Sequence, residues 1–119
     1  MEAVNNRPAV LIVDDDASLR AMLSLSLKRA GYPTLSAGSG AEALELLATR
    51  PIACLVTDGR MDPMDGFELS RRAKSLRPDL RIAMVSAVFT AADAESSPID
   101  CVFEKPVAVS SLVAWLQQR

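Results

Sequence analysis

The sequence predicts an α/β fold, in which helices cover both faces of an open, parallel sheet of five strands. Its 119 residues are enough for one domain with a sizeable core, and 50% of them are apolar. Short, continuous apolar runs alternate along the chain with stretches in which apolar residues recur at helical spacing. Strands that alternate with helices pair in parallel through right-handed crossovers, which place helices on both faces of the sheet.

The first half of the chain predicts three strands and two helices. The continuous apolar run Val10–Val13 is typical of a strand covered on both faces. A helix follows and ends at Gly31, and a weaker strand is expected over residues 33–37. A second helix ends before Pro51, and Ile52–Val56 forms the third strand. The two helical stripes consist of Leu19, Leu23, Leu27 and Ala30, and of Ala41, Leu44, Leu47 and Ala48.

The second half predicts two strands and two helices with clear apolar stripes, and between the two strands a further helix that is short or irregular. A turn-rich loop over residues 58–66 precedes a helix that stops before Pro78, since proline disfavours helical geometry in the residue before it. Ile82–Val85 and Cys101–Phe103 are the fourth and fifth strands, and we expect Ser110 to cap the last helix. The apolar stripes of these two helices consist of Leu69, Ala73 and Leu76, and of Val109, Leu112, Val113 and Leu116.

Charge and composition exclude several classes of function. The 13 lysines and arginines stand against 15 aspartates and glutamates, so we expect no direct binding to nucleic acid. The longest apolar runs fall short of the ~20 residues that span a bilayer, and residues 1–8 lack a secretory signal, so we expect a cytoplasmic protein without membrane contact. The absence of histidine excludes Ser-His-Asp and Cys-His catalysis and His-ligated zinc.

Polar side chains follow four of the five expected strands. In sheets of this type, ligands bind outside the carboxyl ends of the strands, so these side chains mark the candidate site. Taken singly, each has a structural explanation: Asp16, for example, is suited to cap the first helix. Together, they supply what a site for phosphate and metal requires. They are Asp14, Asp15 and Asp16 after the first strand, Asp58 after the third, Ser86 after the fourth and Lys105 after the fifth.

Electrostatics favour a cation among these groups. Two carboxylates ~5 Å apart repel each other by about 3 kcal/mol at an effective dielectric constant near 20. A hard divalent ion such as Mg²⁺ accepts carboxylates, water and phosphate oxygens as ligands. Lys105 and the Ser86 hydroxyl are suited to bind phosphoryl oxygens, and Asp58 is a candidate nucleophile that forms an acyl phosphate.

These motifs, in this order, resemble the receiver domain of response regulators in two-component signalling. The resemblance extends from about residue 8 to the end of the chain. It implies a flavodoxin-like, doubly wound sandwich with strand order 2-1-3-4-5, and a single domain over residues 1–119 with a flexible tail at 1–7. The motifs are Val13-Asp14-Asp15, the segment from Asp58 to Gly66, Ser86-Ala87 and Lys105-Pro106.

The resemblance also implies roles for individual residues. Asp58 would accept a phosphoryl group from the phosphohistidine of a sensor histidine kinase or a phosphotransfer protein. Mg²⁺, with Mn²⁺ as an alternative, would be held by Asp14, Asp15, Asp58 and the backbone carbonyl of Arg60. Ser86 and Lys105 would hold the phosphoryl oxygens. Such a chain is a signalling domain with at most slow autophosphatase activity rather than an enzyme, and it acts through a downstream protein target. We expect the final helix to leave no room for an effector domain, and therefore expect a single-domain regulator or an excised receiver.

Three departures from the family pattern bear on switching. Asp62 precedes Pro63 where the family has proline directly after the loop methionine, and we expect its side chain to point into solvent. Val102 replaces the aromatic residue that reports phosphorylation, and Phe103 beside it is expected in the core. The stretch between Ser86 and Lys105 is about three residues short, so the fourth helix is expected to have one to two turns or to be irregular. Its start has a capping box at residues 90–93, and Pro98 ends it.

Two alternative functions remain open on the sequence. Residues 38–43 match the G-x-G-x-x-A fingerprint of dinucleotide-binding enzymes, although that function leaves Asp14, Asp15 and Lys105 unexplained. A degenerate receiver would fold alike and act as a phosphorylation-independent binding module.

Two further features concern packing. Cys54 and Cys101 are expected to be free thiols, because the implied strand order places them roughly 10 Å apart. Trp115 is expected to be packed against the body of the domain.

Overall fold

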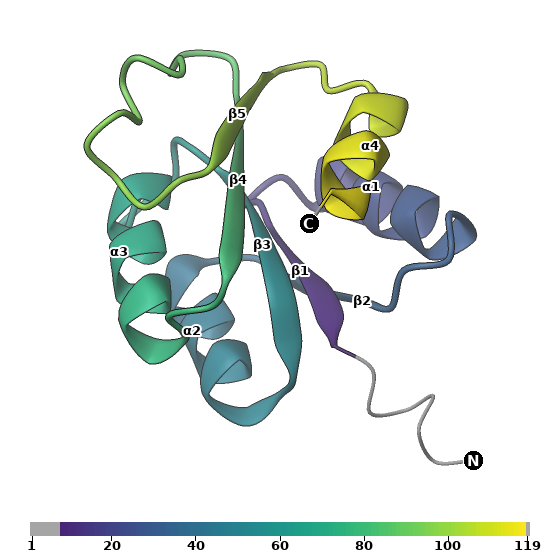
Figure 1. The fold of residues 1–119 in the computed structure, drawn as a ribbon, viewed down its shortest axis with the longest axis horizontal. Helices are drawn as coiled ribbons and strands as arrows, with labels where there is room; N and C mark the ends of the chain where they lie inside the picture. The colour runs from purple at the N-terminus through teal and green to yellow at the C-terminus, as the bar shows by residue number, and fades with distance from the viewer. Residues whose placement is uncertain (1–7, 119) are drawn as a thin grey trace.

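A parallel sheet of five strands forms the centre of the computed structural model, which describes residues 8–118 (Figure 1). The strands lie in the order β2-β1-β3-β4-β5, and every pair of neighbours is parallel. The fold class and the strand order expected from the sequence are therefore confirmed. The expected tail at residues 1–7 lies outside the described residues. The strands are β1 (Ala9–Val13), β2 (Thr34–Ala37), β3 (Ile52–Asp58), β4 (Arg81–Ser86) and β5 (Cys101–Glu104).

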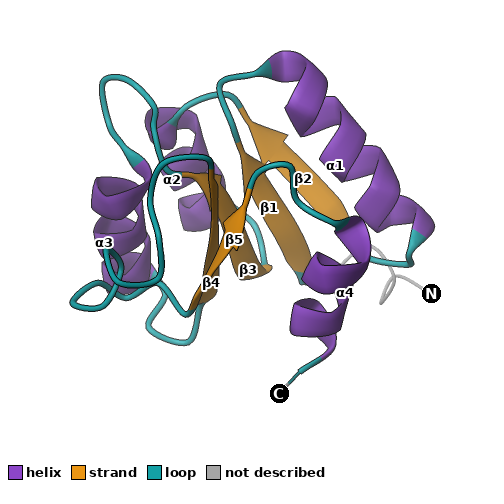
Figure 2. Cartoon of the chain, turned by 90° about the horizontal axis from the view of Figure 1, so that it is seen from above, coloured by secondary structure: helices purple, strands orange, loops and turns teal. Residues whose placement is uncertain are grey.

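The helices flank the sheet in two pairs. Figure 2 shows α2 and α3 on one face of the sheet and α1 and α4 on the other. Three of the helices begin at a side chain that accepts backbone N–H groups of the first turn, namely Asp16, Ser39 and Asp65. Among residues 8–118, no helix has both the length and the apolar character that crossing a bilayer requires. The helices are α1 (Ala17–Arg29), α2 (Gly40–Thr49), α3 (Gly66–Leu76) and α4 (Val109–Gln117).

The strand pleat divides the core into two layers. Leu11 and Val13 of β1 point to the layer under α2 and α3, whereas Val10 and Ile12 point to the layer under α1 and α4. The central strands are buried on both faces, which explains why they read as continuous apolar runs. The acidic and hydroxyl side chains at the strand ends are therefore attached to strands that are buried on both faces.

The segment between β4 and β5 contains no helix. Its backbone forms successive turns, in which the N–H groups of residues 93, 94, 95 and 97 each bond to the carbonyl three positions earlier. Half of the expected capping box is present, since the Thr90 N–H donates to the Asp93 carboxylate at 2.8 Å. The prediction of a short or irregular fourth helix is confirmed in its irregular form, and the helix labelled α4 is the last helix of the chain.

One prediction about the last helix is wrong. The N-cap of α4 is Ala108, which makes no side-chain capping bond, and Ser110 lies inside the first turn. The helix begins earlier because Val109 packs against the core layer shared with α1. Ser110 is therefore already helical and does not cap the helix.

The expectations for the thiols and aromatic residues agree with the structure. Cys54 on β3 and Cys101 on β5 are free thiols separated by β4. Trp115 is buried, and Phe103 is partly buried and meets the Trp115 ring edge-on at a centroid distance of 6.5 Å.

Candidate functional site

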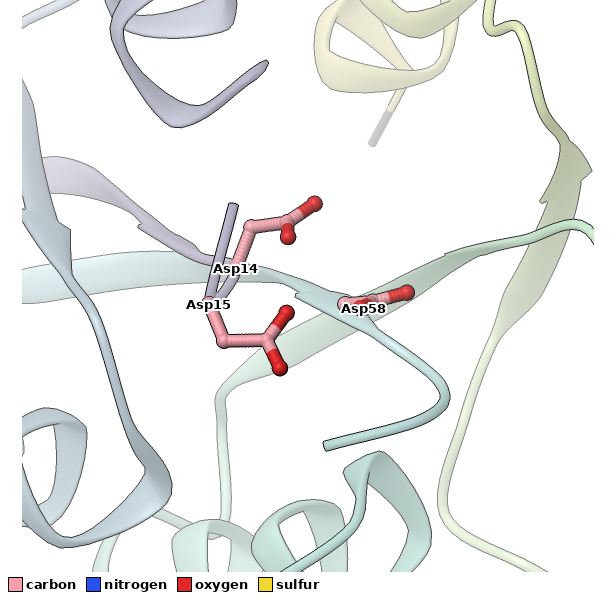
Figure 3. Close-up of side chains that lie close together, drawn as sticks. All are labelled: Asp14, Asp15 and Asp58. Atoms are coloured by element: carbon pink, nitrogen blue, oxygen red, sulfur yellow. The ribbon is translucent and has the colours of Figure 1, made fainter. Parts of the chain in front are cut away.

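The carboxyl ends of four neighbouring strands bring the candidate residues to one edge of the sheet. Asp14 follows β1, Asp58 ends β3, Ser86 ends β4 and Lys105 follows β5. The register sets their relative height, because Val13 is level with Thr57, and Ser86 with Glu104. Figure 3 shows Asp14, Asp15 and Asp58 close together beyond the ends of β1 and β3.

Three carboxylates form an acidic cluster at this edge. Asp14, Asp15 and Asp58 each offer an oxygen, and these oxygens lie within 4.8 Å of one another. Asp14 and Asp58 are only 3% and 7% exposed, whereas Asp15 is exposed. Buried carboxylates at this separation repel each other unless positive charge lies among them.

Lys105 supplies part of that charge. Its Nζ lies 3.0 Å from Asp58 Oδ1 and 3.4 Å from Asp14 Oδ2, and its side chain is 24% exposed. Burial alone would lower the pKa of Lys105, but hydrogen bonding and charge attraction to Asp58 and Asp14 outweigh it and raise that pKa. Lys105 is therefore held as a cation against two of the three carboxylates.

One ammonium does not compensate three carboxylates. The pKa of Asp14 is raised, first by burial and then by the nearby charge of Asp58, even though the Asp16 N–H and Lys105 act in the opposite direction. The donor set consists of closely spaced carboxylate oxygens with one member open to solvent. Hard oxygen ligands with access for water fit a divalent cation such as Mg²⁺.

Ser86 presents a buried hydroxyl beside the phosphoacceptor candidate. It is 1% exposed, and its Oγ accepts hydrogen bonds from the backbone N–H groups of Val88 and Phe89 at 3.1 and 3.0 Å. These two bonds leave the hydroxyl proton available for donation. A Cβ at Gly59 would lie 3.0 Å from Ser86 Oγ and 2.8 Å from the Phe89 ring, so the close approach requires glycine.

The loop after Asp58 forms one wall of a cleft of about 310 Å³ beside the acidic cluster. Met61 is buried, whereas Asp62 is exposed as expected. Asp62 nevertheless lines the same cleft as Asp15 and Arg60. The loop closes where the Gly66 N–H donates to the Gly59 carbonyl at 2.9 Å, and a Cβ at Gly66 would overlap the Asp58 carbonyl oxygen.

Two contacts at the site were missed by the sequence reasoning. The Arg20 guanidinium donates to the backbone carbonyl of Asp14 at 2.6 Å. Phe89 packs edge-on against Phe67 with ring centroids 4.9 Å apart. A basic residue one turn into the helix after an acidic triplet was a signal for the first contact, whereas spacing held no signal for the second.

The glycine motif at residues 38–43 has a structural explanation. Ser39 Oγ accepts the Glu42 N–H at 3.2 Å, and Glu42 Oε1 accepts the Gly38 N–H at 2.8 Å. A Cβ at Gly40 would lie 2.7 Å from the Met64 sulfur, so this glycine allows α2 to approach the loop that follows β3. The motif caps and packs a helix, and its two capping bonds occupy N–H groups that a dinucleotide phosphate would need.

Comparison with known proteins agrees with this geometry. Residues 10–117 match the family model described as the response regulator receiver domain. The response regulator receiver protein CpdR of Brucella abortus is 36% identical, with 92% of this chain and 93% of CpdR covered. The transcriptional regulatory protein GlrR of Escherichia coli is 34% identical, but the chain spans only 26% of its length.

Solved structures show the same fold. A response regulator receiver protein from Pseudomonas putida has a TM-score of 0.87 and 32% identity, with 95% of this chain and 98% of that chain covered. A response regulator from Burkholderia pseudomallei, solved with a phosphorylated aspartic acid, calcium and citrate, has a TM-score of 0.85 and 27% identity, with 94% and 68% covered. Because the family model spans most of this sequence and CpdR matches it over nearly its whole length, the chain belongs to the response regulator receiver domains, the signalling domains of two-component systems.

Proposed function

We propose that Asp58 is the residue of this receiver domain that takes up the phosphoryl group. The single observation that carries the proposal is the position of Asp58 Oδ1, 3.0 Å from the Lys105 ammonium and within a cluster of three carboxylates. Asp58 is the member of the cluster that ends the central strand β3, next to the buried Ser86 hydroxyl on β4. The phosphorylated aspartic acid of the Burkholderia pseudomallei relative supports the same chemistry.

The proposed reaction is a transfer between a nitrogen and an oxygen. An Asp58 carboxylate oxygen forms a bond to phosphorus while the bond from phosphorus to the donor's imidazole nitrogen breaks, and the imidazole takes up a proton. Lys105 pairs with one phosphoryl oxygen and the Ser86 hydroxyl donates to another, so both groups stabilise the charge that they face. The donor is the phosphohistidine of a sensor kinase or phosphotransfer protein, because this chain has no histidine of its own to carry the phosphoryl group.

A divalent cation, Mg²⁺ or alternatively Mn²⁺, belongs to the proposal. Asp14, Asp15 and Asp58 would hold it together with the carbonyl of Arg60. When bound, such an ion neutralises phosphoryl charge during transfer. Support comes from the spacing of the three carboxylates and from the calcium ion of the Burkholderia pseudomallei relative.

The remaining parts of the proposal concern the setting of the domain. We place it in the cytoplasm, where it receives its phosphoryl group and signals by changing a surface that binds a downstream protein. The only reaction that the domain itself catalyses is the slow hydrolysis of its own phosphoryl group. The chain covers 93% of CpdR but 26% of GlrR, so receivers similar to it occur both nearly alone and within longer proteins.

Mass spectrometry after treatment with acetyl phosphate and Mg²⁺ tests the proposal. The wild-type chain should gain one phosphoryl group, and Asp58→Asn should gain none, because the amide is not a nucleophile of comparable strength. Asp79→Asn is the matched control, since it removes an exposed carboxylate before the start of β4, at the opposite end of that strand from Ser86, and it should be labelled like the wild type. Labelling of Asp58→Asn would refute the acceptor assignment, and an unlabelled wild type would favour the phosphorylation-independent binding module.

A further inference from the structure

Arg20 ties the acidic loop to the helix that follows it. It lies in the first half of α1, is half-buried, and donates from Nη1 to the backbone carbonyl of Asp14 at 2.6 Å. That carbonyl belongs to the peptide unit that joins Asp14 to Asp15. Its orientation therefore sets the direction in which both carboxylates leave the backbone.

The guanidinium is also confined from the side of β2. A Cβ at Gly38 would lie 3.3 Å from Arg20 Nη1 and 3.6 Å from Arg20 Cζ. Gly38 is itself fixed, because its N–H donates to Glu42 Oε1 at 2.8 Å. The strand before it is tied to the acidic loop, since the Asp14 N–H donates to the Ala37 carbonyl at 3.2 Å. Arg20 thus fills the space between the loops that follow β1 and β2.

Asp14 is held at every polar group of its residue. Its Oδ1 accepts the Asp16 N–H at 2.9 Å, and its Oδ2 lies 3.4 Å from the Lys105 Nζ. The N–H is bonded to Ala37 and the carbonyl to Arg20. Asp15, in contrast, is exposed, and the peptide unit before it is the part of its backbone that Arg20 holds.

We propose that Arg20 is a positioning residue for the cation site: it fixes the peptide between Asp14 and Asp15, so that both carboxylates face the ion together. Arg20 donates to a backbone carbonyl and is not a ligand. The inference rests on the proposed cation-binding role of these carboxylates. Groups that orient metal ligands in this way typically contribute 10- to 100-fold to metal affinity.

The charge of Arg20 and its proposed positioning role predict opposite changes in Mg²⁺ affinity when Arg20 is replaced. A guanidinium beside the cluster repels a divalent cation, so its loss would strengthen binding if charge alone mattered. If Arg20 acts by position, its loss frees the peptide unit and weakens binding. The sign of the change in Mg²⁺ affinity therefore separates the two roles.

Isothermal titration with Mg²⁺ alone, on unphosphorylated protein, tests the proposal. We expect Arg20→Gln to bind Mg²⁺ about tenfold more weakly than the wild type. Arg20→Lys, which keeps the charge and one donor, should recover part of the affinity. Arg29→Gln is the matched control, because it removes an exposed arginine from the last turn of the same helix, and its affinity should equal that of the wild type.

Gly38→Ala provides a second, independent variant. The added methyl group would lie 3.3 Å from Arg20 Nη1, so the guanidinium must shift by a few tenths of an ångström, and we expect a smaller loss of Mg²⁺ affinity than for Arg20→Gln. Once Arg20 is already glutamine, the same change should have no further effect, since the crowded group is gone. Such non-additivity is expected only for groups that act through each other.

The outcomes separate this inference from the proposed function. Wild-type protein that binds no Mg²⁺ would refute the cation site itself, and the inference with it. Binding in the wild type with equal or tighter binding in Arg20→Gln would refute the inference alone. Thermal unfolding without Mg²⁺ reports whether each variant folds, and if Arg20→Gln does not, Arg20→Lys and Gly38→Ala decide the question.

Discussion

The Nζ of Lys105 lies 3.0 Å from Oδ1 of Asp58, so the end of the edge strand β5 is joined to the end of the central strand β3 across β4. The same ammonium lies 3.4 Å from Asp14 Oδ2. Lys105 thus serves as a counter-ion for two buried carboxylates that come from separate strands. A divalent cation and Lys105 would both neutralise the negative charge of these carboxylates. The stability of the domain should therefore depend on each of them.

Replacing Lys105 tests this dependence. Lys105→Met should lower the free energy of unfolding in metal-free buffer by about 1–2 kcal/mol, because it leaves Asp14 and Asp58 without their counter-ion. The expected loss lies below the ~3–5 kcal/mol typical of a broken buried pair, since solvent screens the partly exposed ammonium. Mg²⁺ should restore part of the loss. Urea unfolding followed by Trp115 fluorescence measures both effects.

The control for this experiment is Lys28→Met, which removes an exposed lysine from the last turn of α1. It should change the unfolding free energy by less than about 0.5 kcal/mol. Equal urea midpoints for Lys105→Met and the wild type without metal would contradict the counter-ion role.

The raised pKa of Asp14 predicts that the stability of the domain depends on pH. Burial, followed by the charge of Asp58, raises the pKa of Asp14 in the folded protein above its ordinary value of 3.8. Between these two pKa values the folded state binds more protons than the unfolded state, so stability falls as pH rises. The contribution of Asp14 is fully present below 3.8 and is lost as pH passes through the raised folded value.

Asp14→Asn should therefore raise the free energy of unfolding at neutral pH in metal-free buffer. The amide keeps an acceptor for the Asp16 N–H but carries no charge to be buried. Below 3.8 the two proteins should differ little, because Asp14 is then protonated in both the folded and the unfolded state. Urea unfolding at acidic and neutral pH checks this, and a variant that is less stable than the wild type at neutral pH would show that Asp14 stabilises the fold in its charged form.

Sequence patterns predicted the parts of the molecule that depend on strand and helix periodicity. The runs around Val10–Val13 and Ile82–Val85 correspond to strands, and the residues that follow them meet at one edge because parallel strands share a direction. The start of α4 was misplaced at Ser110, since capping preference is local whereas the helix start is set by packing. The contact from Arg20 to Asp14 depends on a side-chain path that no periodicity encodes.

Arg81 binds the carboxyl end of the last helix, α4. Its guanidinium donates to the carbonyls of Trp115 at 2.8 Å and Gln118 at 2.9 Å, and more weakly to Leu116 at 3.4 Å. Its Cζ also lies 4.1 Å from the centroid of the Trp115 ring. A cation at the carboxyl end of a helix satisfies free carbonyls and interacts favourably with the helix dipole.

Arg81→Ala should thus lower the free energy of unfolding by about 2–3 kcal/mol, from two charge-assisted hydrogen bonds and one cation–π contact. The Trp115 emission spectrum should change as the ring loses its cover. Arg77→Ala, which removes one bond from a guanidinium to the Arg50 carbonyl, is the control and should cost about 1 kcal/mol. Equal losses in the two variants, measured by urea unfolding, would contradict a special role for Arg81.

If Asp58 is phosphorylated as proposed, the apolar side chain of Val88 predicts slow hydrolysis of the acyl phosphate. Val88 lies two residues after Ser86, is 53% exposed, and donates its backbone N–H to Ser86 Oγ. Hydrolysis of an acyl phosphate needs a positioned water molecule, and an apolar side chain at this place cannot bind one.

Val88→Glu should accelerate phosphoryl loss on the order of tenfold, less than the ~10²–10⁴-fold effect of a well-positioned base. The decay of phosphorylated protein, followed by mass spectrometry after removal of acetyl phosphate, gives the rate. Val88→Ala stays apolar and should decay like the wild type. An equal rate for Val88→Glu would show that the side chain at this position does not position the attacking water molecule.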